Sequence, residues 1–326
     1  MKILLVRVSS LGDVLHNLPM VADLLRQYPG ALIDWVVEEG YVSLVRLNPH
    51  VRNIIPFALR RWRKSLGSAA TRAEIAAFWR SLRAESYDLV FDTQGLLKTG
   101  IIMGAARLAP GGRKIGLGNG SEGSGYEAVS RIFHTDSIKL DPRTHAVARG
   151  RLVAANALGY AIDRAPDFGL PAVDNAPRPA WMPAAPYAVF FHGTARAAKQ
   201  WPSANWIALG RQLAPMPVLL AWGSPAEKIE AETIAASLPN AQVLPKLPMN
   251  DAVTLARNAA LAVGVDTGLT HIAAAFLRPT VEIYADSPRW KTEGNWSPLI
   301  VNLGDAGAPP SVAEVAAACA RLMERP

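Results

Sequence analysis

Two acidic residues of this 326-residue chain follow short apolar runs, at points where a strand is expected to end and a helix to begin. Asp13 follows the run 3–8, and Asp266 follows the run 261–265. The start of a helix presents free N–H groups and the positive end of the macrodipole, which favour anions and phosphates above all. An acid at such a point either caps the helix or faces a ligand, and each residue taken alone fits both interpretations.

Asp13 lies in the segment 9–16, which reads Ser-Ser-Leu-Gly-Asp-Val-Leu-His. A carboxylate there can take the proton of a sugar hydroxyl as the hydroxyl oxygen attacks. Because the helix start favours an anion, we expect Asp13 to be ionised at neutral pH. Helix capping alone is the alternative.

Three loops of the second half carry residues suited to a nucleotide diphosphate. Thr194 and Lys199 follow the apolar run 187–192, Glu227 follows 218–222, and His271 lies one turn beyond Asp266. A threonine can donate to a phosphate, a lysine can neutralise a leaving diphosphate, and a glutamate can accept from ribose hydroxyls. Taken alone, Lys199 fits a solvated loop charge, Glu227 a first-turn helix acid, and His271 a satisfied surface or core histidine. Together, on successive loops, they predict a nucleotide-diphosphate pocket.

Strand-like and helix-like segments alternate along the chain and predict an α/β fold of two Rossmann-like domains with parallel sheets. Six prolines between 166 and 186 indicate a linker, so we expect domains at 1–165 and 187–326. The cleft between the domains, at the carboxyl ends of the strands, is the expected site. The expected strands are 3–8, 32–37, 87–92, 187–192, 218–222, 241–244, 261–265 and 280–284; the expected helices are 13–28, 41–47, 71–85, 97–108, 202–213, 226–237, 251–258, 269–277 and 311–323.

A glycine-rich stretch covers residues 111–125 and includes Gly118-Asn-Gly120-Ser-Glu-Gly123. That spacing matches a dinucleotide-binding turn, which would indicate a dehydrogenase. However, the preceding apolar run is short and basic, and the expected following helix, 126–133, has barely two turns. The stretch is therefore interpreted as a mobile loop.

Composition narrows the classes of partner. The net charge is +7, and a dense basic cluster reads Arg60-Arg61-Trp62-Arg63-Lys64. Such charge suits a nucleic acid, an anionic membrane face or a phosphorylated substrate. Neither an aromatic-rich RNA-binding strand nor a helix-turn-helix is predicted, so no nucleic acid is expected. No apolar run reaches the ~18 residues of a transmembrane helix, and the single cysteine, Cys319, excludes internal disulfides.

In their order along the chain, these motifs resemble those of glycosyltransferase family 9, the bacterial lipopolysaccharide heptosyltransferases. The resemblance spans almost the whole chain. Its most specific parts are the segment 9–16 and the basic cluster 60–64. The others are Asp92-Thr-Gln94-Gly-Leu-Leu-Lys98, Lys199-Gln-Trp-Pro, the turn from Trp222 to Glu227, and Val265-Asp-Thr-Gly-Leu-Thr-His271.

The resemblance implies a GT-B fold and inverting transfer of L-glycero-D-manno-heptose from ADP-heptose to a Kdo sugar of Kdo-lipid A. It implies Asp13 as base and Lys199 beside the leaving diphosphate. Donor contacts would come from Thr194, Lys199, Glu227, Leu247, Asp266, Thr267, Gly268, Leu269 and His271. Acceptor contacts would come from Ser10, Gly12, Arg60, Arg61, Arg63, Lys64, Gln94 and Lys98.

No metal or other cofactor is expected, because lysine and amide donors can stabilise a diphosphate and no Asp-x-Asp pair for Mg²⁺ occurs. The expected location is cytoplasmic, on the inner-membrane face, where the basic cluster would contact anionic lipid. The chain departs from the family pattern at Ala195, which replaces a second hydroxyl residue, at Leu247, where a methionine is common, and in the loop 121–125, which lacks an arginine.

Two alternatives remain open. The chain could be another glycosyltransferase or an epimerase acting on a nucleotide sugar with the same fold. It could also be a binding protein for nucleotide sugars without catalytic activity.

Overall fold

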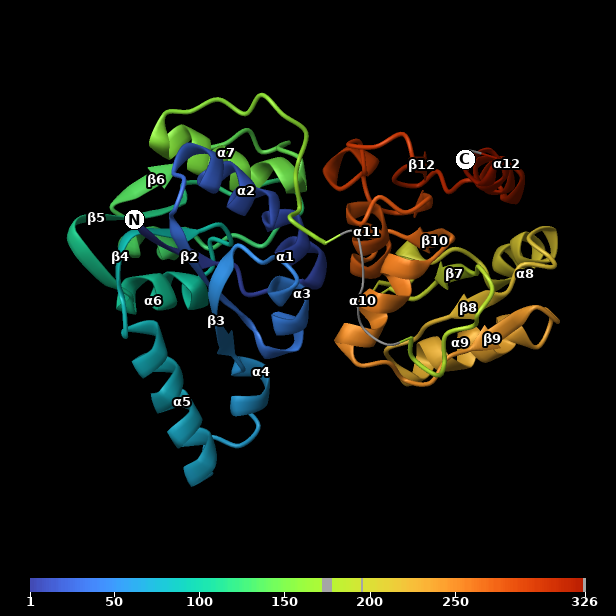
Figure 1. Ribbon diagram of the computed structural model, residues 1–326, viewed down its shortest axis with the longest axis horizontal. Helices are drawn as coiled ribbons and strands as arrows, with labels where there is room; N and C mark the ends of the chain where they lie inside the picture. Colours follow the sequence, from blue (N-terminus) through green and yellow to red (C-terminus); the bar gives the residue numbers. More distant parts are fainter. Residues whose placement is uncertain (172–177, 195, 325–326) are drawn as a thin grey trace. The chain divides into compact units, whose positions relative to one another are not determined.

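The structure is a computed structural model that describes residues 1–171, 178–194 and 196–324 (Figure 1). The chain forms two compact units, which are Met1–Leu170 and Pro171–Pro326. Part of the expected linker 166–186 and the departure at Ala195 lie outside the described residues. Within the described chain, no helix is both long and apolar enough to cross a membrane.

The first unit is a parallel sheet in the order β3-β2-β1-β4-β5-β6. The chain runs outward from β1 to β3 and then returns to β4 on the other side of β1, so the carboxyl ends of β1 and β4 meet at the switch point. The elements are β1 (Lys2–Val6), α1 (Leu11–Asn17), α2 (Pro19–Gln27), β2 (Leu32–Glu38), η1 (Glu39–Tyr41), α3 (Val42–Arg46), β3 (Val51–Phe57), α4 (Leu59–Trp62), α5 (Ala69–Leu82), β4 (Ser86–Asp92), α6 (Leu97–Ala105), β5 (Arg107–Leu117), η2 (Ala128–Phe133), β6 (Asp136–Ile138) and α7 (Ala146–Leu158).

The second unit repeats this design in the order β12-β11-β10-β7-β8-β9, also parallel. Its switch point lies between β7 and β10. The elements are β7 (Ala188–Phe191), η3 (Ala197–Lys199), α8 (Ser203–Gln212), β8 (Val218–Leu220), α9 (Pro225–Ala235), β9 (Ala241–Val243), α10 (Met249–Asn258), β10 (Leu261–Val265), α11 (Gly268–Ala275), β11 (Thr280–Tyr284), η4 (Arg289–Lys291), β12 (Ile300–Gly304) and α12 (Val312–Met323).

Helices cover both faces of each sheet, which is why the central strands are almost wholly buried. In the first unit of Figure 1, α2 and α7 lie on one face of the sheet and α6 on the other. The core beneath α5 and α6 joins β1 and β4 to Phe78 and Met103. The second core contains Trp201 and Trp206, whose rings meet edge to face at 5.1 Å.

The glycine-rich stretch is the main correction to the predicted elements. Residues 107–117 form strand β5, so the helix predicted at 97–108 ends at Ala105 and the mobile-loop interpretation is wrong for this part. Pairing between β4 and β5 shifts register between Tyr87 and Leu89. A Cβ on Gly112 would meet the Tyr87 carbonyl oxygen at 2.7 Å, so the glycine permits the close approach at this bulge.

The sequence patterns also missed β3, β6, β12 and α7, and merged α1 and α2 into one helix, 13–28. Pro19 starts α2 at its first position, which explains the break. The expected alternation of strands and helices in two parallel-sheet units is confirmed.

Candidate active site

Asp13 lies at the switch point of the first sheet, in the third position of α1. Its Oδ2 accepts from the backbone N–H of Ser10 at 3.0 Å and from the Ser10 hydroxyl at 2.9 Å. Ser10 is the exposed N-cap, and Gly12 is half-buried in the first turn of α1. The capping interpretation is therefore correct, but it uses only one oxygen of the carboxylate.

The other oxygen of Asp13 pairs with Arg7, whose Nη2 lies 2.6 Å from Oδ1. The Arg7 side chain is buried and also donates to the carbonyl of Thr93. Partial burial raises the pKa of Asp13, but the Arg7 guanidinium and the Ser10 N–H lower it more. The net pKa lies well below the usual value, so the carboxylate is ionised at neutral pH, as predicted. The Asp13 side chain keeps 36% of its surface exposed.

Gln94 and Lys98, which follow β4, hold the turn before Asp13. The Gln94 side-chain oxygen accepts from the backbone N–H of Val8 at 2.9 Å and of Ser9 at 3.4 Å. Lys98 Nζ lies 3.4 Å from Ser9 Oγ. Because Gln94 is buried and committed to these bonds, the structure gives it a positioning role, while half-buried Lys98 presents its ammonium beside the turn.

The basic cluster 60–64 is divided by its contacts. Arg61 pairs with Glu39 at 2.9 Å and with Glu74 at 2.8 Å, so this guanidinium fastens the segment to the unit. Arg60, Arg63 and Lys64 are exposed. Trp62 is buried, and its ring meets Phe57 edge to face at 5.4 Å.

In the second unit, Asp266 is the centre of a buried polar network at the end of β10. Its Oδ2 accepts from Lys199 Nζ at 2.5 Å and from the Ser287 hydroxyl at 2.6 Å. Its Oδ1 accepts from His271 Nε2 at 3.0 Å and from the Thr292 hydroxyl at 3.1 Å. With four donors in place, Asp266 positions Lys199 and His271, and its predicted contact to the donor substrate would have to displace one of them.

His271 bridges two carboxylates, since its Nδ1 lies 2.9 Å from Glu282 Oε1. Burial by itself lowers the pKa of His271, but Glu282 and Asp266 raise it to about 10. The ring is therefore an imidazolium at neutral pH and donates from both nitrogens. Burial raises the pKa of Asp266, but His271 and Lys199 lower this pKa by more than burial raises it, so the carboxyl remains ionised.

The first turn of α11 is open toward solvent. Thr267 is its N-cap, and Thr267, Gly268 and Leu269 are all partly exposed. The N–H groups at this helix end have no helical acceptor, so they can bind the oxygens of a phosphate. Lys199 lies near the same helix end, because its Nζ donates to Asp266, the residue before the N-cap of α11. Thr194 is half-buried in the loop after β7.

Glu227 caps α9 and packs against the loop after β7. Its Oε2 accepts from the N–H of Gly223 at 2.7 Å and of Ser224 at 3.1 Å. A Cβ on Gly193 would meet the Glu227 carboxyl carbon at 2.6 Å, so a larger residue at 193 would displace the Glu227 side chain. Leu247, half-buried, lies in the loop between β9 and α10.

Sequence reasoning missed Glu282, Ser287 and Thr292. Glu282 carried a usable signal, because a charged residue in the middle of an apolar parallel strand needs a buried partner. Ser287 and Thr292 lie in loops without a distinctive pattern. Among the described residues, no group of three or more His, Cys, Asp or Glu side chains is arranged to hold a metal ion, and a metal-free reaction stays a prediction.

Comparisons with known proteins identify the family. The family model of glycosyltransferase family 9 (heptosyltransferase) matches residues 75–318. Lipopolysaccharide heptosyltransferase 1 of Pseudomonas aeruginosa is 39% identical over 287 residues, covering 87% of this chain and 78% of that protein.

Two solved structures are also similar. The E. coli heptosyltransferase WaaC with ADP superposes with a TM-score of 0.83 at 32% identity, covering 97% of this chain and 98% of that one. The same enzyme with ADP-2-deoxy-2-fluoro heptose gives 0.78 at 32% identity, with 99% of each chain covered. The predicted α/β fold of the GT-B type is confirmed. The chain belongs to glycosyltransferase family 9, the heptosyltransferase family, and is a glycosyltransferase.

Proposed function

We propose that this enzyme transfers heptose from ADP-heptose to a Kdo sugar of Kdo-lipid A, with inversion at the anomeric carbon. Similar proteins support ADP-heptose as the donor and a role in lipopolysaccharide synthesis. One relative is a lipopolysaccharide heptosyltransferase 1, and two similar structures hold ADP or an ADP-heptose analogue. The observation that carries the proposal is Asp13, an ionised and partly exposed carboxylate at a switch point, backed by a buried arginine.

The second unit supplies the donor site. The free N–H groups of Gly268 and Leu269 and the positive end of α11 bind the diphosphate. Lys199, held by Asp266 at 2.5 Å, turns to the β-phosphate when the donor binds. Thr194 donates to the phosphates, Glu227 accepts from the ribose, and Leu247 packs on the adenine.

The reaction is a single displacement. The acceptor hydroxyl oxygen forms a bond to the anomeric carbon as the bond from that carbon to the diphosphate oxygen breaks. The leaving electron pair goes to ADP, where Lys199 and the helix N–H groups stabilise the new charge. The hydroxyl proton passes to Asp13. Because Arg7 keeps the pKa of Asp13 low, this carboxylate accepts the proton only as the hydroxyl oxygen loses electron density to the new bond.

The first unit supplies the acceptor site. Arg60, Arg63, Lys64 and Lys98 are cations that match the phosphates and carboxylates of Kdo-lipid A, and such charge also favours the anionic cytoplasmic face of the inner membrane. Arg61 joins them only by giving up its pairs with Glu39 and Glu74. The substrates are ADP-heptose and the lipid acceptor, with no metal, further cofactor or nucleic acid.

The test is incubation of the purified protein with ADP-heptose, with and without Kdo-lipid A, followed by mass spectrometry of lipid and nucleotide. We expect the lipid to gain one heptose and ADP to appear in equal amount. Conversion of ADP-heptose into an isomer without any acceptor would favour an epimerase. Binding of ADP-heptose without either change would favour a non-catalytic binding protein.

A further inference from the structure

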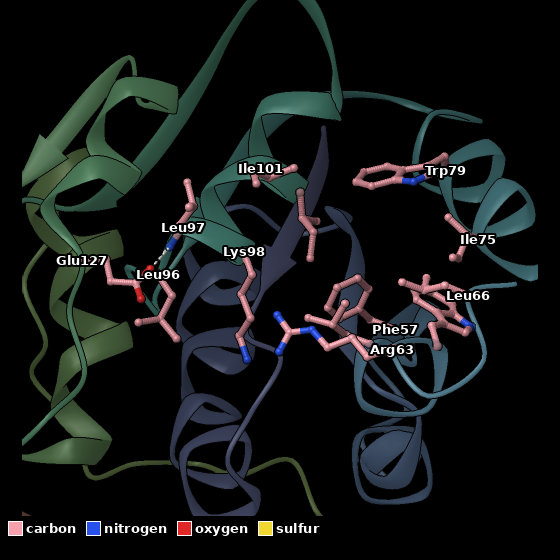
Figure 2. Close-up of a pocket in the computed structure, with 13 residues that line it drawn as sticks. Phe57, Arg63, Leu66, Ile75, Trp79, Leu96, Leu97, Lys98, Ile101 and Glu127 are labelled. Carbon is pink, nitrogen blue, oxygen red and sulfur yellow. Dashed lines mark hydrogen bonds between the residues drawn. The ribbon is translucent and has the colours of Figure 1, made fainter. Parts of the chain in front are cut away.

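An apolar pocket of about 580 Å³ lies wholly within the first unit, between the segment after α4 and helices α5 and α6. Its walls include Leu66, Ile75, Trp79, Leu97 and Ile101 (Figure 2). Cavities that bind small ligands have volumes of roughly 300–1,000 Å³ and mostly apolar walls. Arg63 and Lys98, assigned above to the acceptor site, line it too, whereas its apolar residues have no role in the proposed reaction.

The pocket is open to solvent, and its rim is apolar. Leu66 is 57% exposed, Leu97 40% and Ile101 43%. Three large apolar side chains gathered around one opening are costly in water and are typical of a surface that binds an apolar partner.

One side of the pocket is cationic. The side chains of Lys98 and Arg63 both line it, and Figure 2 shows their charged ends close together at one side of the apolar walls. Burial lowers the pKa of Lys98, and the neighbouring Arg60 and Arg63 add to this effect, while the carboxylates of Glu38 and Glu127 oppose it without reversing it. Two like charges brought together in this way are stabilised by an anion between them.

The lining also contains a carboxylate, Glu127, but its Oε2 accepts the backbone N–H of Leu97 at 2.6 Å. This bond commits it to the start of α6. Glu127 still offsets part of the charge of Lys98, but the net effect on the pKa of Lys98 remains a lowering, so the pair can still attract an anion from outside.

The cationic side leads to the turn that carries Asp13. Lys98 lines the pocket, and its Nζ lies 3.4 Å from Ser9 Oγ, one residue before the N-cap of α1. The apolar walls therefore adjoin the cationic pair, and Lys98 in turn adjoins the turn that carries the proposed general base. This order matches a molecule with an apolar chain, then an anionic group, then a sugar hydroxyl.

We infer that the pocket binds one acyl chain of the acceptor lipid, while Lys98 and Arg63 hold an anionic group that lies between the chain and the sugar. This inference rests on the proposed function, because it assigns a further part of the same acceptor. It makes the lipid chain a recognised part of the substrate. An amphipathic peptide would also suit the apolar walls, but it would not explain why the cationic pair leads to Asp13.

The first test measures binding without turnover, by titrating the full chain with n-alkyl phosphates of increasing length below their micelle concentrations. We expect affinity to rise roughly fourfold for each added methylene, as apolar burial predicts, and to level off once the pocket is filled. Ile101→Glu should weaken binding of the longer chains at least tenfold. Ile132→Glu is the matched control, because Ile132 is 72% exposed in the same unit and does not line the pocket.

Both substitutions place glutamate at exposed positions, so we expect both variants to fold. Affinity independent of chain length, or equal losses in the two variants, would overturn the inference. A change of oligomeric state in Ile101→Glu with unchanged alkyl phosphate binding would also overturn it, because the pocket would then belong to a second copy of the chain.

The second test compares transfer to acylated and to fully deacylated Kdo-lipid A. Ile101→Glu should raise KM at least tenfold for the acylated acceptor and leave KM unchanged for the deacylated acceptor and for ADP-heptose. Equal effects on the two acceptors would contradict an acyl-chain site. If the wild type modified neither acceptor, the proposed function would fail, while the alkyl phosphate titration would still decide whether the pocket binds a lipid chain.

Discussion

Replacing Asp13 with asparagine tests the base and its support separately. The new amide oxygen can still accept from the Ser10 N–H, so the helix cap is kept. The amide carries no charge to balance Arg7, which is buried 2.6 Å away, and it cannot take a proton. We therefore expect Asp13→Asn to lose both stability and turnover, from different causes.

The two losses have different magnitudes. Breaking a buried ion pair costs about 3–5 kcal/mol. Because the Asp13 side chain is 36% exposed, solvent screening reduces the expected loss of unfolding free energy to roughly 1–3 kcal/mol. In a unit of this size that lowers Tm by roughly 2–10 °C. Loss of a general base lowers kcat about 10²–10⁴-fold, or roughly 3–5 kcal/mol in activation free energy.

A second substitution distinguishes these effects. Arg7→Met removes the charge that Asp13→Asn leaves without a partner, so the double variant should lose less stability than the two single losses added together, by about 1–2 kcal/mol. Its kcat should stay as low as that of Asp13→Asn. Thermal denaturation followed by circular dichroism gives the first quantity, and initial rates of ADP release at saturating substrate give the second.

Glu232→Gln is the control, because it removes an exposed carboxylate that pairs with Lys228 at 3.3 Å on α9. An exposed pair is worth about 0–1 kcal/mol, so neither stability nor kcat should change measurably. If Asp13→Asn kept more than a tenth of wild-type kcat, Asp13 would not be the base. Recovery of kcat in the double variant would assign the loss to a disturbed turn instead.

Three further predictions concern the second unit. His271 has a folded pKa of about 10, above its ordinary 6.5, so its protonation stabilises the fold fully below about pH 6.5, and this contribution is lost as the pH rises through 10. Glu282→Gln removes one of the charges that raise this pKa and should move the fall in Tm to lower pH. A pH profile of Tm that does not change would contradict the ion network. Gly193→Ala places a Cβ 2.6 Å from the Glu227 carboxyl carbon and should weaken ADP binding about 10–100-fold, as measured by calorimetry. An unchanged affinity for ADP would show that Glu227 is not part of the donor site. Lys199→Met should lower kcat about 10²–10³-fold, and a change in KM alone would mean that this lysine does not stabilise the leaving group.

Local sequence was enough to place most of the candidate residues on their elements. Short apolar runs followed by Asp13 and Asp266 predicted strand ends and helix starts, because burial on both faces of a parallel sheet requires near-continuous apolar residues. Where that signal weakens, the prediction failed. β5 contains Gly111, Gly112 and Gly116, and glycine clusters ordinarily indicate a loop.

The partners of these residues depend on the tertiary structure. Asp266 meets Lys199, 67 positions earlier, because β7 and β10 are neighbours across a switch point. In the same way β1 beside β4 brings Lys98 to the turn of Asp13. Apolar periodicity specifies which residues form a strand and which face is buried, but strand order is selected by the packing of the whole sheet. For this chain, sequence determined which residues stand at the strand ends, and the fold decided which of them meet.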